Sequence, residues 1–359
     1  MKMGNKIGLR QLLALEIARI LRKNKVELHP LRQLFWECTL RCNLHCLHCG
    51  SDCKKTASTD DMPLKDFLNT IDTIKPHVDP AKVCIVITGG EPLMRNDLES
   101  CGLALYRKGF PWGIVTNGLY LDKQRFDNLI RSGLNSITIS LDGFEKEHNW
   151  LRGHPQSFNK AVNAIQLIAS EKDLNWDVVT CVNQKNYTCL EEFKKYLISI
   201  GVKSWRIFTI FPVGRASKHP ELYLSKEEFT GLMEFIKRTR KERNIHLNYA
   251  CEGFLGKYEG EVRDNFFSCN AGVSVASILI DGSISACPSI RSNFKQGNIY
   301  RDNFIDVWNN RFTSFRNREW MKTDQCATCK SFRYCEGNGM HLRNNEGKLL
   351  FCHLNRFIN

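Results

Sequence analysis

The sequence lacks a long, uninterrupted run of apolar residues. Its most leucine-rich stretch, "GLRQLLALEIARILRK", is broken by Glu16 and Arg19, so it does not form the apolar segment of a secretory signal. No run elsewhere reaches the length that a helix needs to cross a bilayer. Internal repeats, low-complexity tracts and an RNP-type RNA-binding motif are also missing. These absences favour a protein of the reducing cytoplasm that neither spans a membrane nor binds nucleic acid.

Acidic residues are in the minority, and the formal net charge is +13. A charge of this sign can attract nucleic acid, a membrane surface or an acidic peptide, and it can also be no more than a solvated basic surface. Because no nucleic-acid motif is present, we expect no nucleic-acid partner. A weak membrane-surface contact and an acidic peptide both stay open.

Cysteine, in contrast, is abundant: the 359-residue chain has 16 cysteines, with 42% hydrophobic and 25% charged residues. This composition is typical of a globular protein with a buried core, and the length allows two domains. In a long chain without a secretory signal, clustered thiols bind metal more often than they form disulfides. Two further thiols, Cys84 and Cys181, lie in apolar strands and are expected in the core.

Apolar residues at helical spacing predict a helix near the N-terminus. The stripe comprises Leu9, Leu12, Leu13, Ile17, Ile20 and Leu21. Basic residues, among them Arg10, Arg19 and Lys23, surround it. We expect the stripe to dock on the body of the protein or, alternatively, to lie on a membrane surface.

Beyond residue 32, strand-like and helix-like segments alternate six times, from a strand at 34–38 to a helix at 226–243. Such alternation predicts parallel strands with helical crossovers, and in barrels of this kind the chemistry lies at the carboxyl ends of the strands. Near residue 246 the helices give way to short strands and cysteines, with a hairpin around Asp281 and Gly282. We expect three parts: a basic amphipathic helix (1–31), an α/β barrel (32–245) and a small cysteine-rich α+β domain (246–359).

Three cysteines follow the first predicted strand in a C-x3-C-x2-C pattern: Cys42, Cys46 and Cys49. Three thiolates can hold three irons of a four-iron cluster and leave the fourth iron open to an outside ligand, unlike a closed structural zinc site. The spacing of the neighbouring Cys38 and Cys53 does not mark them as ligands, and we expect them to be free thiols.

The segment "CNLHCLHC" (42–49) resembles the signature of the radical S-adenosylmethionine (SAM) superfamily, and "TGGEP" (88–92) resembles that superfamily's next motif. The resemblance implies a partial (β/α)6 TIM-like barrel, a [4Fe-4S] cluster on the three cysteines, and SAM chelating the open iron. Gly89 and Gly90 would let backbone carbonyls approach the SAM ammonium group, Glu91 would add a charge-assisted contact, and Pro92 completes the motif.

The resemblance places four further residues at the SAM site. Ser140, in "SLDG", stands where relatives contact the ribose, and His48 where relatives often carry an aromatic residue against the adenine. Asn117, in "TNG", is expected to line the cavity. Arg152 is expected to pair with the SAM carboxylate or, alternatively, to form a surface salt bridge.

The C-terminal cysteines resemble those of the SPASM domain of radical SAM peptide-modifying enzymes, which usually binds two auxiliary iron–sulfur clusters. On that pattern, one four-thiolate site comprises Cys326, Cys329, Cys335 and Cys352. A second site has Cys269 and Cys287, with Cys251 as an upstream ligand, but Gly339 stands where the pattern has a cysteine. We therefore expect one or two auxiliary clusters. By spacing alone, the four-thiolate site also suits structural zinc.

The resemblance implies an enzyme that reductively cleaves SAM to a 5′-deoxyadenosyl radical and takes hydrogen from a peptide or protein, giving an oxidation, a crosslink or a thioether. One alternative is a radical SAM/SPASM enzyme acting on a tetrapyrrole or other small molecule, and another is a non-catalytic metal-binding interaction protein. No catalytic base is evident, since Pro288 stands where some relatives carry an aspartate.

The expected partners follow from the same resemblance. They are a peptide or small protein substrate and an electron donor such as flavodoxin or ferredoxin. The segment before the first strand is too short for the winged-helix peptide-recognition domain of many relatives. We therefore expect either that a separate recognition protein presents the peptide or that the barrel and the SPASM domain recognise the substrate alone. The resemblance extends to a subgroup associated with a small lipoprotein.

Overall fold

The computed structural model describes residues 7–290 and 293–357, and its centre is a ten-stranded sheet with the order β10-β9-β8-β1-β2-β3-β4-β5-β6-β7. The strands are β1 (Gln33–Thr39), β2 (Cys84–Gly89), β3 (Trp112–Thr116), β4 (Leu134–Ser140), β5 (Asn175–Val182), β6 (Ser204–Thr209), β7 (His246–Tyr249), β8 (Val275–Ile278), β9 (Ser283–Ser285) and β10 (Gly297–Asn298). Parallel pairing runs from β8 through β1 to β7, whereas β9 pairs antiparallel with β8 and β10.

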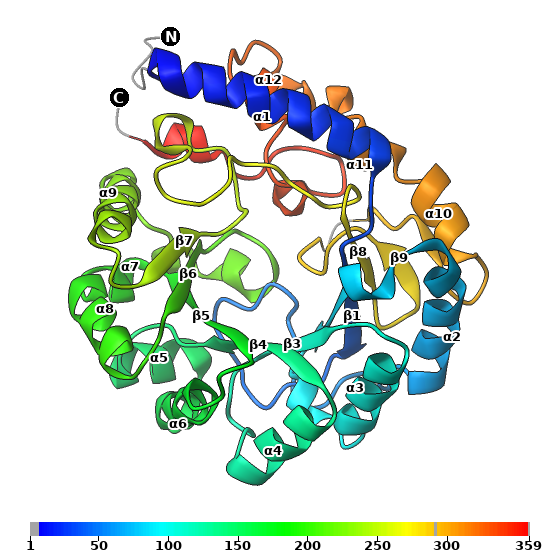
Figure 1. The fold of residues 1–359 in the computed structure, drawn as a ribbon. Helices are drawn as coiled ribbons and strands as arrows, with labels where there is room; N and C mark the ends of the chain where they lie inside the picture. Colours follow the sequence, from blue (N-terminus) through cyan, green and yellow to red (C-terminus); the bar gives the residue numbers. More distant parts are fainter. Residues whose placement is uncertain (1–6, 291–292, 358–359) are drawn as a thin grey trace.

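The sheet curls, and helices cover its outer face (Figure 1). The helices along the barrel are α2 (Leu64–Ile74), α3 (Leu98–Arg107), α4 (Lys123–Arg131), α5 (Glu145–Arg152), α6 (Ser157–Ala169), α7 (Gln184–Tyr187), α8 (Leu190–Ser199) and α9 (Lys226–Glu242). The others are α1 (Leu9–Leu28), α10 (Phe304–Asn310), α11 (Thr313–Arg316) and α12 (Phe332–Cys335). The expected partial barrel followed by a cysteine-rich region is confirmed, and β1 to β6 alternate with helices as the apolar pattern predicts.

The cysteine-rich region continues the sheet of the barrel. After the sixth crossover, α9 leads into β7, which pairs in parallel with β6. On the other side, β8 pairs in parallel with β1, and the predicted hairpin at Asp281 and Gly282 is the turn between β8 and β9. One hydrophobic cluster includes Leu15 of α1, Trp36 of the barrel and Phe315 near the C-terminus. The barrel and the C-terminal region therefore share one core.

The N-terminal helix lies within the expected range 1–31, of which 1–6 are outside the described residues, and it docks with the face opposite the leucine stripe. α1 spans Leu9–Leu28 and is held by polar side chains: Gln11 donates to the Glu259 carbonyl at 2.6 Å, and Lys25 donates to Asn270 at 2.9 Å. Of its leucines and isoleucines, only Leu15 is fully buried. The expectation that the leucine stripe docks on the body was wrong, because these hydrogen bonds and Leu15 orient the helix.

Two smaller expectations can be compared with the structure. Cys84 and Cys181 were expected in the core, but both are only partly buried, because each lies on a strand position that does not face the covering helices. In the described part of the chain, no helix combines the length and the apolar character needed to cross a membrane.

Candidate active site

The cysteine triplet lies directly after β1, at the carboxyl end of the barrel strands. Cys42 and Cys49 pack around a small cluster formed by Leu44, Cys46 and Leu119. Burial, and then the neighbouring charges, including those of Cys46 and Cys49, raise the pKa of the Cys42 thiol to about 12. The fold therefore gathers the three thiols on one side of the barrel mouth, as the spacing predicts.

The glycine pair after β2 holds the start of this cysteine loop. The Gly90 N–H donates to the Thr39 carbonyl at 2.7 Å, and the Glu91 N–H donates to the Arg41 carbonyl at 2.9 Å. A Cβ on Gly90 would lie 2.2 Å from the Arg41 carbonyl oxygen, and Gly89 has a φ of +138°. Both glycines are thus required by backbone packing, and their contact with SAM stays a prediction.

Glu91 connects the ends of two strands. Its carboxylate accepts hydrogen bonds from the Thr116 hydroxyl at 2.6 Å, the Asn117 N–H at 2.8 Å and the Leu93 N–H at 3.1 Å. Burial raises the pKa of this carboxyl group, although these donors oppose the shift. Because both oxygens already accept hydrogen bonds, the side chain has a structural role here besides the expected contact with the SAM ammonium group.

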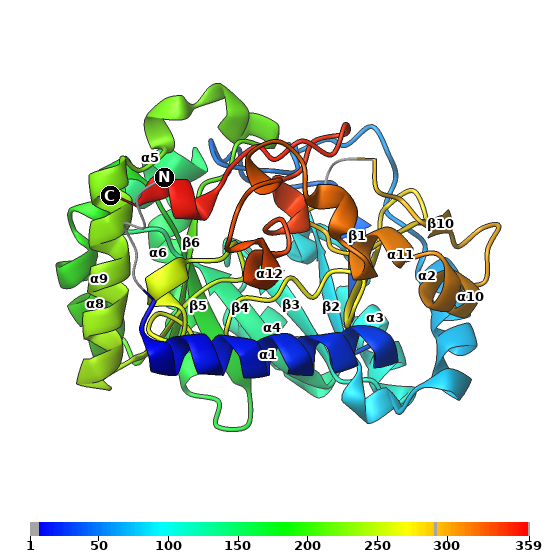
Figure 2. The same cartoon turned by 90° about the horizontal axis from the view of Figure 1, so that it is seen from above.

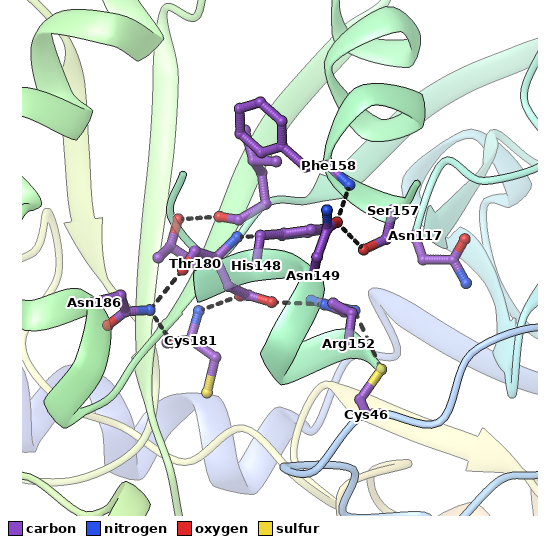
Figure 3. A network of polar contacts seen from close by, with 12 residues as sticks. Cys46, Asn117, His148, Asn149, Arg152, Ser157, Phe158, Thr180, Cys181 and Asn186 are labelled. Carbon is purple, nitrogen blue, oxygen red and sulfur yellow. Dashed lines mark hydrogen bonds and ion pairs between the residues drawn. The ribbon is translucent and has the colours of Figure 1, made fainter. Parts of the chain in front are cut away.

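Arg152 forms a buried ion pair beside the cysteine triplet (Figure 3). Its Nε lies 2.6 Å from Asp142 Oδ2, and its Nη1 lies 3.9 Å from Cys46 Sγ. Burial opposes the charge on Asp142, but Arg152 and the nearby histidines lower the pKa of Asp142 to about 2. The alternative of a surface salt bridge for Arg152 is therefore wrong, and its contact with the SAM carboxylate stays a prediction.

Asp142 is a residue that the sequence reasoning missed, although it stands in the "SLDG" segment. Its side chain accepts from the Cys181 N–H at 2.8 Å, and its backbone carbonyl accepts from Asn186 Nδ2 at 2.7 Å. Its N–H donates to His148 Nδ1 at 3.0 Å. These contacts join β4 to α5, β5 and α7. They hold Asp142 in place, and its carboxylate in turn positions Arg152.

The other expected SAM contacts lie around the same mouth. Ser140 is the last residue of β4 and is buried, and Asn117 donates through Nδ2 to Asn43 at 2.8 Å. His48 Nδ1 is buried without a hydrogen-bond partner in the described part of the chain. Burial lowers the pKa of His48 to about 4, so its imidazole is neutral at ordinary pH.

Arg215 is a second residue that the sequence reasoning missed. Its Nε donates to the Cys46 carbonyl at 2.8 Å, and its Nη1 donates to the Cys53 carbonyl at 2.9 Å and to Asp52 at 2.7 Å. A signal was available, since "GRA" (214–216) follows the sixth strand, and strand ends in such barrels carry chemistry. Arg215 therefore fastens the cysteine loop from the far side of the barrel.

Cys53 is a free thiol, as expected, and it also contacts the triplet. A hydrogen bond from the Cys53 thiol lowers the pKa of Cys49 to about 5. The chain reverses between the two residues, with Asp52 at a positive φ of 50°. This reversal is not visible in a count of sequence spacing.

The C-terminal thiols form two groups. Burial, followed by the charges of Cys352, Cys326 and Cys329, raises the pKa of Cys335, so the expected four thiols lie near one another. In the other group, burial and then Cys251 and Cys269 raise the pKa of Cys287 to about 12. The structure thus brings Cys251 to the two cysteines that it was expected to join, and its role as a ligand stays a prediction.

Gly339 lies in the second group, and its surroundings leave no room for a cysteine. A Cβ at this position would lie 2.6 Å from His341 Cε1 and 2.8 Å from the Glu252 carbonyl oxygen. The next N–H, that of Met340, hydrogen-bonds the Cys269 thiol. The imidazole ring of His341 therefore fills the space that a side chain at Gly339 would occupy.

The donor sets consist of thiols, which are the ligands of iron–sulfur clusters. In the ranges 7–290 and 293–357, no three His, Cys, Asp or Glu side chains converge closely enough to hold one metal ion. Zinc would draw its thiolates to about 2.3 Å from one centre, whereas a four-iron cluster binds each thiolate through a different iron. The orphaned His48 Nδ1 and Asn43 Nδ2 beside the triplet also fit a polar ligand at that place.

Comparison with known proteins identifies the family. Residues 36–197 match the Radical SAM superfamily. The chain carries a radical SAM domain. Residues 269–330 match SPASM, an iron–sulfur cluster-binding domain. The protein is therefore a radical SAM enzyme with a SPASM domain, and the two domains imply [4Fe-4S] clusters and SAM as its cofactors, which confirms these expectations.

Relatives of this radical SAM protein differ in their substrates. It is 25% identical over 330 residues to the AdoMet-dependent heme synthase of Nitratidesulfovibrio vulgaris, covering 87% of this chain and 88% of that protein. It is 28% identical over 319 residues to mycofactocin maturase MftC of Mycobacterium tuberculosis, covering 86% and 78%. The fold also resembles Streptococcus suis SuiB bound to S-adenosylmethionine, with a TM-score of 0.68, 20% identity and coverage of 88% and 75%.

Proposed function

We propose that this enzyme uses SAM to take hydrogen from a peptide or small protein and so installs an oxidation, a crosslink or a thioether. The observation that carries the proposal is the cysteine triplet at the barrel mouth, with Arg152 directed at Cys46 Sγ. The mycofactocin maturase relative supports the substrate class. The similarly folded SuiB has been crystallised with its precursor peptide, which agrees with this class.

The residues around the triplet would bind the cluster and orient SAM. When bound, the cluster and SAM supply one-electron cleavage to methionine and a 5′-deoxyadenosyl radical, which abstracts hydrogen from the substrate. Cys42, Cys46 and Cys49 would hold the cluster, and Arg152, whose Nη1 lies near Cys46 Sγ, would place a guanidinium cation beside it. Cationic donors beside a cluster favour its reduced form, since charge and hydrogen bonding set cluster potentials.

The second candidate substrate is a tetrapyrrole. The heme synthase relative supports it over nearly the full length of both chains. The net charge of +13 would suit the carboxylates of such a molecule as well as an acidic peptide. The reaction at the triplet would be the same, and only the group presented above the barrel would differ.

Electrons for either reaction would come from flavodoxin or ferredoxin. The auxiliary site of Cys326, Cys329, Cys335 and Cys352 would remove the second electron from the substrate or bind a substrate thiolate. This site is buried only in part, since Cys329, Cys335 and Cys352 are partly exposed. An external redox partner can therefore reach it.

The test is anaerobic reconstitution with measurement of iron, zinc and 5′-deoxyadenosine. With SAM and dithionite, we expect about eight or more irons per chain, at about four per cluster, little zinc, and deoxyadenosine formation. Cys46→Ala should abolish deoxyadenosine formation and lower the iron content. Cys189→Ala is the matched control, because Cys189 is half-buried at the start of α8, and it should behave like the parent.

Adding either substrate class separates the two candidates. A cysteine-containing precursor peptide or iron coproporphyrin would be added to the same assay, and the favoured substrate should increase deoxyadenosine formation. Stimulation by the porphyrin alone would replace the peptide proposal with the second candidate. A fully loaded protein that makes no deoxyadenosine with either substrate would contradict the proposal.

A further inference from the structure

The outer face of α1 carries a continuous apolar stripe that nothing in the described chain covers. Its members are exposed by 54% to 75% and comprise Leu9, Leu13, Ile17, Ile20, Leu21 and Leu28. Single exposed leucines are ordinary, but contiguous apolar patches of this kind mark interaction sites. Figures 1 and 2 show α1 on the outside of the molecule in both views, with no element over its outer side.

This orientation is held by the polar face of the helix. Arg22 contacts Ser268 and lies 2.5 Å from Glu336, while Glu16 accepts from the Tyr334 hydroxyl at 2.6 Å. With Gln11 and Lys25, these contacts tie the inner face to the C-terminal region. Rotating the stripe inward would break all of them, so the apolar face is a fixed outward feature.

The charges beside the stripe are mostly positive. At 100° per residue, Arg10 falls within the arc of the stripe, between Ile17 and Leu21, and both of these neighbours and Arg10 are exposed. Lys23 is also exposed and lies just beyond the Leu9 edge of the stripe. Lys257, whose carbonyl accepts from Gln11, is exposed as well. Glu16 is turned inward to Tyr334 and Arg19, which leaves Glu27 as the one exposed acid in the described part of α1.

We infer that the outer face of α1 is a peripheral binding surface for a membrane containing anionic phospholipids. An apolar face with one cation within it and one at its edge fits a helix lying in the plane of a lipid interface, where the lysine and arginine side chains reach the head groups. A net charge of +13 adds long-range attraction to such a surface.

This binding is reversible and depends on salt. The helix lies on the membrane with half of its circumference still bound to the protein, so only the outer side chains enter the interface. Because attraction between Arg10, Lys23 and acidic lipids is screened over about a Debye length, binding should weaken as the salt concentration rises.

The experiment is co-sedimentation of the full chain with vesicles of phosphatidylcholine alone or with 30% phosphatidylserine. We expect binding to the anionic vesicles at low salt and at least fivefold weaker binding to the neutral ones. A double variant, Leu13→Gln with Ile17→Gln, should weaken binding to anionic vesicles at least tenfold. Ile198→Gln, on the exposed side of α8, is the matched control and should bind like the parent.

Charge variants provide a second test, because removing a positive and a negative charge should change vesicle binding in opposite directions. Arg10→Glu should weaken binding, and Glu27→Gln should strengthen it about fivefold. Each charge near an acidic membrane surface changes the binding free energy by about 1 kcal/mol, which is about fivefold in affinity. Circular dichroism and SAM cleavage should be unchanged in these surface variants. Absence of vesicle binding by the parent, or equal binding by the Leu13/Ile17 double variant, would overturn the inference. Self-association through the stripe without lipid binding, seen by analytical ultracentrifugation, would also overturn it.

Discussion

At the scale of single residues, charge and space are both tightly matched around the triplet. Asp142 and Arg152 neutralise each other in a buried position. At the glycine pair after β2, any side chain would collide with the backbone at the end of β1 and just after it. Buried ion pairs add little net stability, but removing one partner leaves the other charge buried and unpaired, which is destabilising. Substitutions here should therefore affect stability and cluster binding together.

Arg152→Gln should lower the free energy of unfolding by about 3–5 kcal/mol, because it leaves the Asp142 carboxylate buried without its partner. It should also reduce deoxyadenosine formation strongly. Urea denaturation of the anaerobic protein measures the first effect. Arg206→Gln is the control, since its pair with Asp177 is more exposed, and it should cost about 1 kcal/mol or less. Equal costs for the two variants would contradict the assignment of Arg152 to a buried pair.

Gly90→Ala should prevent the cysteine loop from closing, because the new Cβ would lie 2.2 Å from the Arg41 carbonyl oxygen. We expect iron bound after reconstitution to fall by about four atoms per chain, the content of one cluster. Gly50→Ala in the same loop meets only the edge of the Phe211 ring at 3.8 Å and should bind iron normally. Normal iron content in Gly90→Ala would show that the backbone can shift.

At the scale of elements, the segment from β4 to α5 positions the polar network. Asp142 leaves β4, and its N–H meets His148 from the first turns of α5, while α5 ends at Arg152. Burial lowers the pKa of His148 to about 3. The folded protein therefore holds this imidazole neutral at pH values where the unfolded chain would protonate it.

This shift predicts that stability falls with acid. Because the folded pKa lies below the ordinary value of about 6.5, the contribution of His148 is complete above that pH and is lost as the pH falls toward 3. His148→Asn keeps an acceptor for the Asp142 N–H. Between pH 7 and pH 5, the free energy of unfolding of this variant should therefore fall by about 2 kcal/mol less than that of the parent. Urea midpoints at the two pH values test this, with the exposed His77→Asn as the control.

A parent and a His148→Asn variant with the same pH dependence would show that other groups dominate the acid response. Of those groups, His48 and His341 are partly buried, and desolvation lowers the pKa of each to about 4. The three histidines lie in the barrel and the C-terminal region, so single variants separate their contributions.

At the scale of the whole molecule, two thiol-bearing regions are attached to one sheet. The triplet follows β1, while β8, on the other side of β1, begins the C-terminal region. Because β1 pairs with both β2 and β8, the barrel mouth and the segments that carry Cys269 and Cys287 are attached to neighbouring strands.

Cys329→Ser should remove about four irons per chain and leave dithionite-driven SAM cleavage intact, because the triplet does not depend on this thiol. Product formation from the true substrate should be lost. Iron analysis and electron paramagnetic resonance of the reduced protein check the first part. Loss of one zinc per chain instead, with unchanged iron, would assign the four-thiolate site to zinc. Cys189→Ser should change neither metal.

Sequence motifs predicted those parts of the site whose residues lie close together in the sequence. The triplet, "TGGEP" and the C-terminal thiols are recognisable because a cluster or a tight turn needs its residues within a few positions of one another. Asp142 and Arg215 escaped notice, since their partners Cys181 and Cys46 are 39 and 169 residues away. Such pairs exist only once the strands are placed side by side.

By itself, the sequence determined the two domains, the alternation of strands and helices, and the spacing of the three thiols after the first strand, because all of these depend on local pattern. The tertiary structure decided which acid neutralises Arg152, which backbone atoms require the two glycines, and which thiol approaches Cys287. It also decided which side of α1 faces outward: the periodicity of a helix shows that two faces differ, but only the partners at Glu259, Asn270 and Glu336 determine which face is buried.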